Sequence, residues 1–291
     1  MKILITGGTG FIGKKLTEDL IQSGHELFII SRLKRNNEKN ITYLQWEELN
    51  TGINQSDIVI NLVGESIANK RWTEAQKELL YRSRIESTRL IVNAINNSKN
   101  KPRKLINASA VGIYGDRRDE IIAENSSLGS DFLAHLCKAW EAEANNANTN
   151  VVILRIGIVL GKDGGALQKM LPPFKMFIGG PLGSGNQYMS WIHVDDVVGI
   201  IKFSIENNNV TGILNATSPN PVTNKEFSNV LGKVLERPSF MPAPDFVLRI
   251  LLGEMADLLL CGQRVMPKRT VELGYRFRHV ELEGGLKNIL A

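Results

Sequence analysis

A glycine-rich segment near residue 10 has the composition of a phosphate-binding loop. It reads Gly-Gly-Thr-Gly-Phe-Ile-Gly over 7–13, between an apolar run at 2–6 and a helical pattern at 10–23. Glycine permits the tight turn, lets the backbone approach a pyrophosphate and lets the helix pack on the strand. Free N–H groups at the start of the helix would then face the phosphates. The spacing predicts a dinucleotide site that is built from Gly7, Thr9, Gly10, Phe11, Ile12 and Gly13.

The choice between the two nicotinamide dinucleotides depends on the residues that follow the second expected strand. NAD-binding proteins place an acidic residue there, about twenty residues after the loop, for the ribose 2′-OH. This chain has Ser31 and Arg32, then two further basic residues, and no carboxylate before Glu38. A hydroxyl and a guanidinium suit a 2′-phosphate, because arginine holds phosphate oxygens with two hydrogen bonds. We predict NADP, bound as NADPH, on Ser31 and Arg32; the alternative is a solvated basic loop.

Apolar runs alternate with helical patterns over the first part of the chain. Uninterrupted runs such as Ile58-Val59-Ile60 are typical of strands that are buried on both faces of a parallel sheet. The alternation predicts an α/β fold with a doubly wound, parallel Rossmann sheet. The expected strands are 2–6, 26–30, 41–45, 57–62, 104–109 and 151–157, and the expected helices are 10–23, 73–97 and 131–146.

We expect the chain to form two regions. Residues 1–160 would be the NADP-binding Rossmann domain, and residues 161–291 a smaller, mainly helical substrate subdomain. Glycine-rich loops mark the change between them. A segment at about 186–216 is expected to return to the sheet. The elements expected in the second region are a strand at 188–192, a helix from Asp195 with Asp195 as its N-cap, a strand at 212–216 and helical segments beyond.

Separated motifs follow one another over about 200 residues. They are the loop at 7–13, Asn61-Leu62-Val63-Gly64, Ser109 with Tyr114-Gly115, Arg155-Ile156-Gly157, and Trp191-Ile192-His193-Val194-Asp195-Asp196. Together they resemble the extended short-chain dehydrogenase/reductase superfamily, the NAD-dependent epimerase/dehydratase group. Further motifs are Gly64-Glu65, Arg71-Trp72, Asp131-Phe132-Leu133 with Trp140-Glu141, the loop at 179–185 and Pro267-Lys268-Arg269. These are similar to one branch of that group, the epimerase-family or sugar-nucleotide-epimerase-like proteins, whose substrate is largely undefined.

The resemblance implies more cofactor contacts than the loop alone. Leu62 and Val63, after the fourth strand, would line the cleft between adenosine and nicotinamide. Glu78 and Arg84, on the helix at 73–97, match positions that are associated with NADP binding in this branch. Without the resemblance, both residues are typical of a solvated helical face.

The catalytic pair that the resemblance implies is incomplete. In this superfamily a tyrosine four residues before a lysine supplies the acid or base, and the lysine lowers the pKa of the phenol. A hydroxyl on the preceding strand, here Ser109, orients the substrate. If Lys138 is aligned with the catalytic lysine, Ala134 stands where the tyrosine belongs. If the helix acid Glu141 guides the alignment, Leu133 and Cys137 occupy the pair.

Three interpretations of this departure remain open. Tyr114, on the loop after Ser109, could supply the phenol with Lys138 as its partner; otherwise Tyr114 is a packed aromatic at a strand end. His135 could act as the acid or base, because histidine titrates near neutrality. Finally, the protein could bind NADPH without the usual redox step, or use residues that the sequence does not identify.

Other segments are expected to border the substrate pocket. The glycine-rich loop at 179–185, with Gln187 and Trp191 close behind it, is a candidate, because loops on a rigid scaffold commonly carry specificity. Arg71 and Trp72 are candidates too. His193 is expected to tie the second region to the sheet.

The composition limits the kinds of ligand, macromolecular partner and cellular location that we expect. A net charge of +5 suits anionic small ligands, and the scattered basic residues without interleaved aromatics speak against nucleic acid. No apolar run is long enough for a membrane span, and 246–261 is expected to be an amphipathic helix in the core or at a homodimer surface. The two cysteines, Cys137 and Cys261, are expected to be buried thiols in helices rather than metal ligands. A strand that begins at Lys2 leaves no room for a targeting peptide, so we expect a cytoplasmic protein.

The sequence thus predicts an NADP-dependent oxidoreductase or epimerase of the atypical extended short-chain type. Its substrate would be a small polar, perhaps nucleotide-linked, molecule. The alternative is a non-catalytic, NADPH-binding regulatory protein, since the Tyr–Lys pair is missing. The word epimerase depends on resemblance in fold, and fold does not fix function.

Overall fold

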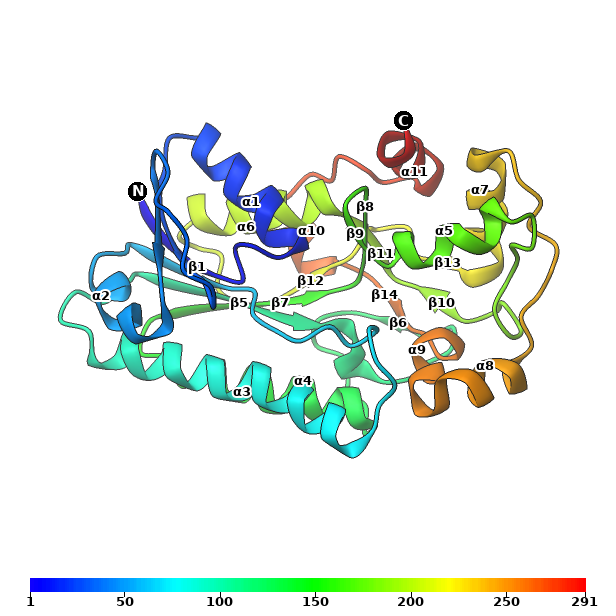
Figure 1. Ribbon diagram of the computed structural model, residues 1–291, viewed down its shortest axis with the longest axis horizontal. Coiled ribbons are helices and arrows are strands. Elements are labelled where there is room, and N and C mark those ends of the chain that lie inside the picture. The colour runs from blue at the N-terminus through cyan, green and yellow to red at the C-terminus, as the bar shows by residue number, and fades with distance from the viewer.

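A seven-stranded, wholly parallel sheet runs through the middle of the computed structural model, which describes residues 1–291 (Figure 1). In spatial order its strands are β12 (Gly212–Ala216), β7 (Asn150–Ile156), β5 (Lys104–Ala110), β4 (Ile58–Asn61), β1 (Lys2–Thr6), β2 (Glu26–Ile30) and β3 (Ile41–Leu44). The strand order reverses between β1 and β4. In sheets of this kind the crevice at such a reversal, outside the carboxyl ends of the strands, binds ligands.

Helices cover both faces of the sheet, which explains why its strands are apolar throughout. The helices α1 (Phe11–Gln22) and α6 (Val194–Glu206) lie on one face, and α2 (Leu49–Asn54), α3 (Glu74–Asn97) and α4 (Phe132–Ala144) lie on the other (Figure 1). Ile3 and Ile5 of β1 pack in a cluster with Leu16 of α1, whereas Leu4 packs with Ile53 of α2 and with α3. Alternate residues of one strand therefore support opposite layers.

The second region covers the carboxyl edge of the sheet at one end of the molecule (Figure 1). Small sheets connect it with the first region. They pair β11 (Trp191–His193) with β8 (Ile158–Gly161) and β9 (Gly164–Gly165), and β14 (Arg264–Val265) with β6 (Ile121–Ile122), while β10 (Tyr188–Met189) pairs with β13 (Val222–Thr223) inside the second region. Its helices are α5 (Leu167–Lys175), α7 (Asn224–Leu235), α8 (Asp245–Leu252), α9 (Asp257–Leu260), α10 (Lys268–Glu272) and α11 (Leu282–Leu290). Short 3-10 turns lie at Trp46–Glu48, Val111–Tyr114 and Gly253–Ala256.

The predicted fold class, a doubly wound parallel sheet with a smaller helical region, is confirmed. Several local predictions are wrong. The strand expected at 188–192 is two strands in different sheets, because Ser190 between them donates and accepts hydrogen bonds with the β14 segment. The helix expected over 246–261 is broken at Gly253, whose φ of +60° does not continue a helix. Cys261 ends that segment, half-buried and outside a helix, whereas Cys137 is buried as predicted.

The start of α6 also differs from the prediction. His193, rather than Asp195, is the N-cap, and its Nδ1 accepts a hydrogen bond from the backbone N–H of Asp195 at 3.0 Å. Asp195 lies in the first helical turn, where its negative charge is favourable near the positive end of the helix dipole.

Candidate functional site

The segment at 7–13 forms the turn that its glycines predict. Gly7 has a φ of +76°, and a Cβ on it would stand 2.7 Å from the carbonyl oxygen of Leu62. A Cβ on Gly13 would stand 2.1 Å from the carbonyl oxygen of Gly7. Helix α1 begins directly after Gly10, with no side-chain cap and no acidic residue in its first turn. The first N–H groups of α1 therefore remain available to an anion at the positive end of the helix dipole.

The side chain of Phe11 packs against the β8–β9 hairpin. Its ring lies against three glycines of the β8–β9 hairpin, where a Cβ on Gly161, Gly164 or Gly165 would approach ring carbons to 2.6, 2.6 and 2.9 Å. The ring thus joins α1 to the hairpin. The backbone N–H of Phe11 lies in the first turn of α1.

The end of β2 carries a turn and a group of basic side chains. Ser31 is buried, and its hydroxyl donates to the carbonyl oxygen of Leu33 at 2.8 Å while accepting the N–H of Leu33 at 3.2 Å. Arg32 is exposed. A cavity of about 320 Å³ lies beside this turn and is lined by Leu33, Lys34, Arg35, Asn36, Asn37, Tyr43, Leu44, Gln45 and Glu48.

Both carboxylates near this turn already have partners. Glu48 accepts the backbone N–H of Gln45 at 2.9 Å, and Glu38 accepts the hydroxyl of Tyr43 at 3.0 Å. The guanidinium of Arg35 lies over the Tyr43 ring, 5.7 Å from its centroid. The region therefore offers positive charge without an acid in the position that would favour a ribose 2′-OH.

Polar side chains inside the sheet fix the turn after β4. Oδ1 of Asn61 accepts the Thr6 hydroxyl at 2.7 Å and the N–H of Val63 at 3.2 Å, and its Nδ2 donates to Asn107 at 2.7 Å. Leu62 and Val63 follow, half-buried at the carboxyl edge beside Gly7. They lie where a nucleotide in the crevice would pass.

Arg84 of α3 reaches back to this turn. Its guanidinium donates to the carbonyl oxygens of Glu65 and Leu80 at 2.9 and 3.2 Å, and it lies over the ring of Trp140 at 5.2 Å. A Cβ on Gly64 would stand 3.0 Å from the guanidinium carbon. Burial lowers the pKa of Arg84, and no carboxylate forms an ion pair with it. A cation without a counter-ion therefore stands at the carboxyl edge of β4.

Glu78 does not share this position. It is exposed, and it makes no side-chain hydrogen bond or ion pair. Six residues along an α-helix correspond to a rotation of about 240°, so Glu78 and Arg84 leave α3 in different directions. The structure brings Arg84, but not Glu78, toward the crevice.

A buried polar network occupies the carboxyl end of β5. Ser109 donates to Glu141 at 2.7 Å, and Glu141 holds the guanidinium of Arg155 with two hydrogen bonds of 2.8 Å. A terminal nitrogen of Arg155 then donates to the hydroxyl of Tyr114 at 2.9 Å. Burial by itself lowers the pKa of Arg155, but the hydrogen bonds and charge of Glu141 raise it above its ordinary value. The pair is a fully charged ion pair that is closed off from water.

This network changes the expectation for Tyr114. The residue is 0% exposed, and its hydroxyl also donates to Oδ1 of Asn215 at 2.8 Å. Burial raises the pKa of Tyr114, although Arg155 opposes the change. A catalytic phenol needs a lowered pKa and contact with the substrate. The geometry favours the other interpretation, in which Tyr114 is a packed aromatic at a strand end.

The α4 residues that were predicted as catalytic partners lie apart from this phenol. Nζ of Lys138 donates to the carbonyl oxygen of Gly129 at 2.6 Å, which fixes the loop before α4. His135 is exposed, and Ala134 is buried. Asp131 caps the helix by accepting the N–H of Ala134 at 2.8 Å. The structure therefore brings Ser109 and Tyr114 into one network and leaves Lys138 and His135 outside it.

Comparison with protein families agrees with this geometry. The model of the NAD dependent epimerase/dehydratase family matches residues 3–216, and a domain of unknown function, DUF1731, matches residues 243–289. The chain belongs to the NAD-dependent epimerase/dehydratase family. The resemblance that the sequence motifs predicted is confirmed.

Members of this family from distant organisms match the chain over its whole length. An epimerase family protein SDR39U1 homolog of Arabidopsis thaliana, described as chloroplastic, is 42% identical and covers 100% of this chain and 87% of its own. The epimerase family protein YfhF of Bacillus subtilis is 41% identical, with 100% and 98% covered. A crystal structure of human epimerase family protein SDR39U1 with NADPH is 38% identical, covers 99% of each chain and has a TM-score of 0.93.

A more remote solved structure is similar in fold alone. UDP-glucuronic acid 4-epimerase of Bacillus cereus, in complex with UDP-glucuronic acid and NAD, is 17% identical with a TM-score of 0.80. As a member of the NAD-dependent epimerase/dehydratase family, this chain keeps the strand hydroxyl Ser109 but has Ala134 four residues before Lys138. The Ser109 hydroxyl donates to Glu141, which forms a buried ion pair with Arg155.

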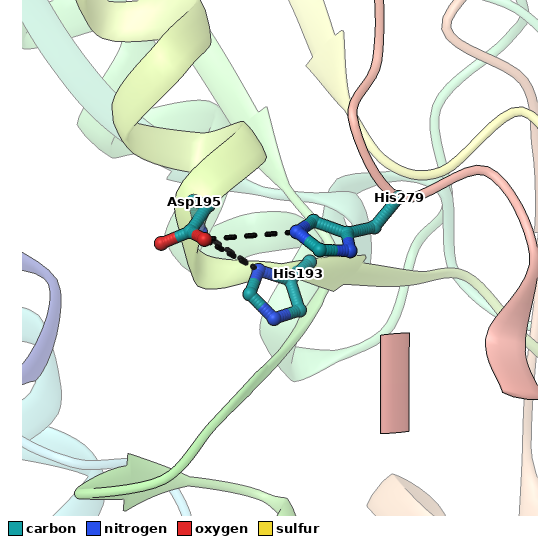
Figure 2. Close-up of side chains that lie close together, drawn as sticks. All are labelled: His193, Asp195 and His279. Atoms are coloured by element: carbon teal, nitrogen blue, oxygen red, sulfur yellow. Dashed lines mark hydrogen bonds and ion pairs between the residues drawn. The ribbon is translucent and has the colours of Figure 1, made fainter. Parts of the chain in front are cut away.

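Two histidines meet at the start of α6, and only one of them was singled out from the sequence. Figure 2 shows the rings of His193 and His279 close together, with the carboxylate of Asp195 beside both. Nδ1 of His193 and Nε2 of His279 lie 3.7 and 3.6 Å from Oδ2 of Asp195. His279 comes from the segment before α11, far along the chain, so no local pattern could have revealed it.

The ring geometry of this cluster suits packing better than metal binding. The two rings are stacked with centroids 3.7 Å apart and planes 26° apart, so their in-plane lone pairs lie in nearly parallel planes. Nδ1 of His193 already accepts the N–H of Asp195, and Lys15 lies 3.4 Å from Asp195. Burial and the neighbouring His279 lower the pKa of His193 to about 4. His193 thus joins the start of α6 to the segment before α11 through its contact with His279.

The residues that were expected around a substrate pocket differ in how far they are buried. Trp191 is fully buried in the core of the second region, so its expected place at the pocket is wrong. Trp72 is half-buried, with its ring edge against Phe132 and its Nε1 donating to Ile67 at 2.8 Å. Gln187 donates to two carbonyl oxygens, and its own Oε1 is enclosed without a partner.

Of the helices in the structure, none is long and apolar enough to span a membrane.

Proposed function

We propose that this protein binds NADPH at the carboxyl ends of β1, β2 and β4 and acts as an NADP-dependent oxidoreductase or epimerase on a small polar substrate. The observation that carries the proposal is the loop from Gly7 to Gly13. A Cβ at either end would collide with backbone, and α1 begins without a cap or an acid. Such a loop accepts a pyrophosphate on backbone N–H groups.

The preference for NADPH follows from the charges beside β2. Lys34 and Arg35 line the cavity beside this turn, and Arg32 is exposed in the turn itself, while the carboxylates of Glu38 and Glu48 accept hydrogen bonds from other groups. A 2′-phosphate gains charge-assisted hydrogen bonds in such a place. Because the Ser31 hydroxyl is engaged with Leu33, we assign the leading part to Arg32. The NADPH in the human relative supports the same choice.

Other groups would contribute to cofactor binding and to hydride and proton transfer. Arg84 supplies positive charge beside Gly64, where the cofactor would pass from β1 to β4. When bound, the nicotinamide would take or return hydride, and the protein supplies orientation and exclusion of water. The proton must come from a group other than the enclosed Tyr114.

A second candidate is a non-catalytic protein whose NADPH occupancy regulates a partner. The observation that favours it is the engagement of both expected catalytic hydroxyls: Ser109 donates to Glu141, and Tyr114 lies between Arg155 and Asn215. In this case the crevice would bind cofactor without turnover of a substrate.

Calorimetric titration with NADPH and NADH tests the shared part of both candidates. Wild type should prefer NADPH, and Arg32→Ala should lose most of that preference, about 10- to 100-fold. The exposed Arg118→Ala is the matched control and should keep it. Equal affinity of wild type for both cofactors would overturn the NADPH assignment. Two assays separate the enzyme from the regulatory protein: nicotinamide absorbance detects reduction of any compound in a panel of aldehydes and ketones, and product analysis detects epimerisation, which consumes no NADPH.

A further inference from the structure

The side chain of Arg264, in β14, is partly buried and has no hydrogen-bond acceptor. Five arginines of the chain are not exposed, and four of them, Arg84, Arg117, Arg155 and Arg269, donate side-chain hydrogen bonds to protein acceptors. Arg264 donates none, and it takes part in no ion pair. Its Nε is enclosed without an acceptor, whereas the terminal nitrogens are open.

The backbone at Arg264 is fixed at the carboxyl edge of the main sheet. The Ser190 hydroxyl donates to the carbonyl oxygen of Gln263 at 2.6 Å and accepts the N–H of Val265 at 2.9 Å. Ser190 itself lies beyond the end of β7, because its carbonyl oxygen accepts the N–H of Ile158 at 2.8 Å. Thr217, just after β12, donates to the carbonyl oxygen of Val265 at 3.2 Å. Arg264 is therefore held at the edge where open α/β sheets bind ligands.

The side chain of Arg264 projects away from the buried cluster around Tyr114 and toward Tyr188. Val265 packs with Tyr114 and Ile122 in a buried cluster, and consecutive residues of a strand project to opposite sides. The guanidinium of Arg264 lies over the ring of Tyr188, 5.1 Å from its centroid. Stacking on an aromatic face orients the planar fork without using any of its N–H donors.

An arginine kept for stability would have acceptors, because an enclosed N–H without one costs free energy. Here the chain provides a rigid backbone and an aromatic support for the guanidinium but no anion. We infer that Arg264 anchors an anionic group of the substrate, a carboxylate or a phosphate, between the sheet edge and Tyr188. This inference deepens the proposed function, on which it rests, by naming the chemical class of the substrate: it carries an anionic group.

Side-chain resonances of arginine in a ¹H–¹⁵N NMR spectrum test the inference on the full chain saturated with NADPH. The enclosed Nε–H of Arg264 exchanges slowly and is assigned by its absence in Arg264→Gln. Inorganic phosphate and acetate are the probes, and chloride at equal ionic strength is the reference. We expect at least one of the two probes to shift this resonance saturably, at least ten times as far as chloride does. Arg118→Gln, at an exposed arginine elsewhere, should leave the response unchanged.

Each outcome has one meaning. A response to phosphate alone indicates a phosphorylated substrate, a response to acetate alone a carboxylate, and a response to both the shared chemistry. An Arg264 resonance that moves with neither probe, or no further than with chloride, overturns the inference. NADPH titration of the same samples separates the two proposals, because Arg264→Gln should bind NADPH within twofold of wild type. If wild type does not bind NADPH but still responds to anions, the proposed function fails and the anion site stands.

Discussion

The hydroxyl of Tyr114 lies 2.9 Å from a terminal nitrogen of Arg155. Through this contact the loop after β5 is joined to β7, and the second bond of the hydroxyl, to Asn215, extends the network to β12. Three strands that are distant in sequence thus share one buried phenol. A catalytic tyrosine would instead present its hydroxyl to a substrate, so the contact makes the two interpretations of Tyr114 testable.

Replacing Tyr114 with phenylalanine should destabilise the protein without affecting the cofactor. The change leaves an N–H of Arg155 and the side-chain oxygen Oδ1 of Asn215 enclosed with one partner fewer, which costs about 1–3 kcal/mol. Urea unfolding measures this loss, and calorimetry should show NADPH affinity within twofold of wild type. Unchanged stability together with lost turnover would instead restore Tyr114 as the catalytic phenol.

A methyl group on Gly13 should open the phosphate loop. The new Cβ of Gly13→Ala would stand 2.1 Å from the carbonyl oxygen of Gly7, so backbone must move. Because close packing of helix and strand places the N–H groups, we expect roughly a tenfold or greater loss of NADPH affinity. Gly284→Ala in α11, where a Cβ meets nothing within 4 Å, is the control and should bind NADPH normally. Normal NADPH binding by Gly13→Ala would remove the loop from the site.

Arg84 should matter for the ligand more than for the fold. Burial lowers the pKa of Arg84 and its guanidinium has only carbonyl partners, so Arg84→Met removes a cation that is costly to enclose. We expect the free energy of unfolding without cofactor to change by less than about 1 kcal/mol. NADPH affinity should fall about tenfold or more. The exposed Arg82→Met, which loses only an ion pair with Glu86, is the matched control. A large loss of stability with unchanged NADPH affinity would make Arg84 a structural residue.

Stability should decline on mild acidification because of His193. Its pKa is lowered to about 4 by burial and by His279, although Asp195 and Asp196 oppose this, while an unfolded histidine has a pKa of about 6.5. Below pH 6.5 the imidazole of His193 is protonated in the unfolded chain but stays neutral in the folded protein. The stabilisation that is present above pH 6.5 is therefore lost as the pH falls toward 4. The expected loss between pH 7.5 and pH 5 is about 2 kcal/mol.

Urea unfolding at the two pH values measures this contribution against a variant. His193→Asn keeps a side-chain acceptor for the helix cap and should remove most of the pH dependence. His135→Gln changes an exposed histidine and should retain it. Equal pH dependence in wild type and His193→Asn would show that His193 is not the titrating group.

The sequence by itself determined the parallel sheet and the phosphate loop. Strand periodicity and the spacing of Gly7, Gly10 and Gly13 are local properties, which can be recognised in the sequence before the fold is known. The same holds for the absence of an acid after β2 and of a tyrosine before Lys138. These features specified the cofactor site and the departure from the expected catalytic pair.

Only the tertiary structure decided which polar side chains are free. Tyr114 and Ser109 are enclosed by Glu141, Arg155 and Asn215, which come from other elements, and nothing near them in sequence indicates this. His279 reaches His193, and Arg264 remains without an acceptor, for the same reason. A hydrogen bond depends on distances between segments that are far apart in the chain, whereas a sequence pattern records only neighbours along it.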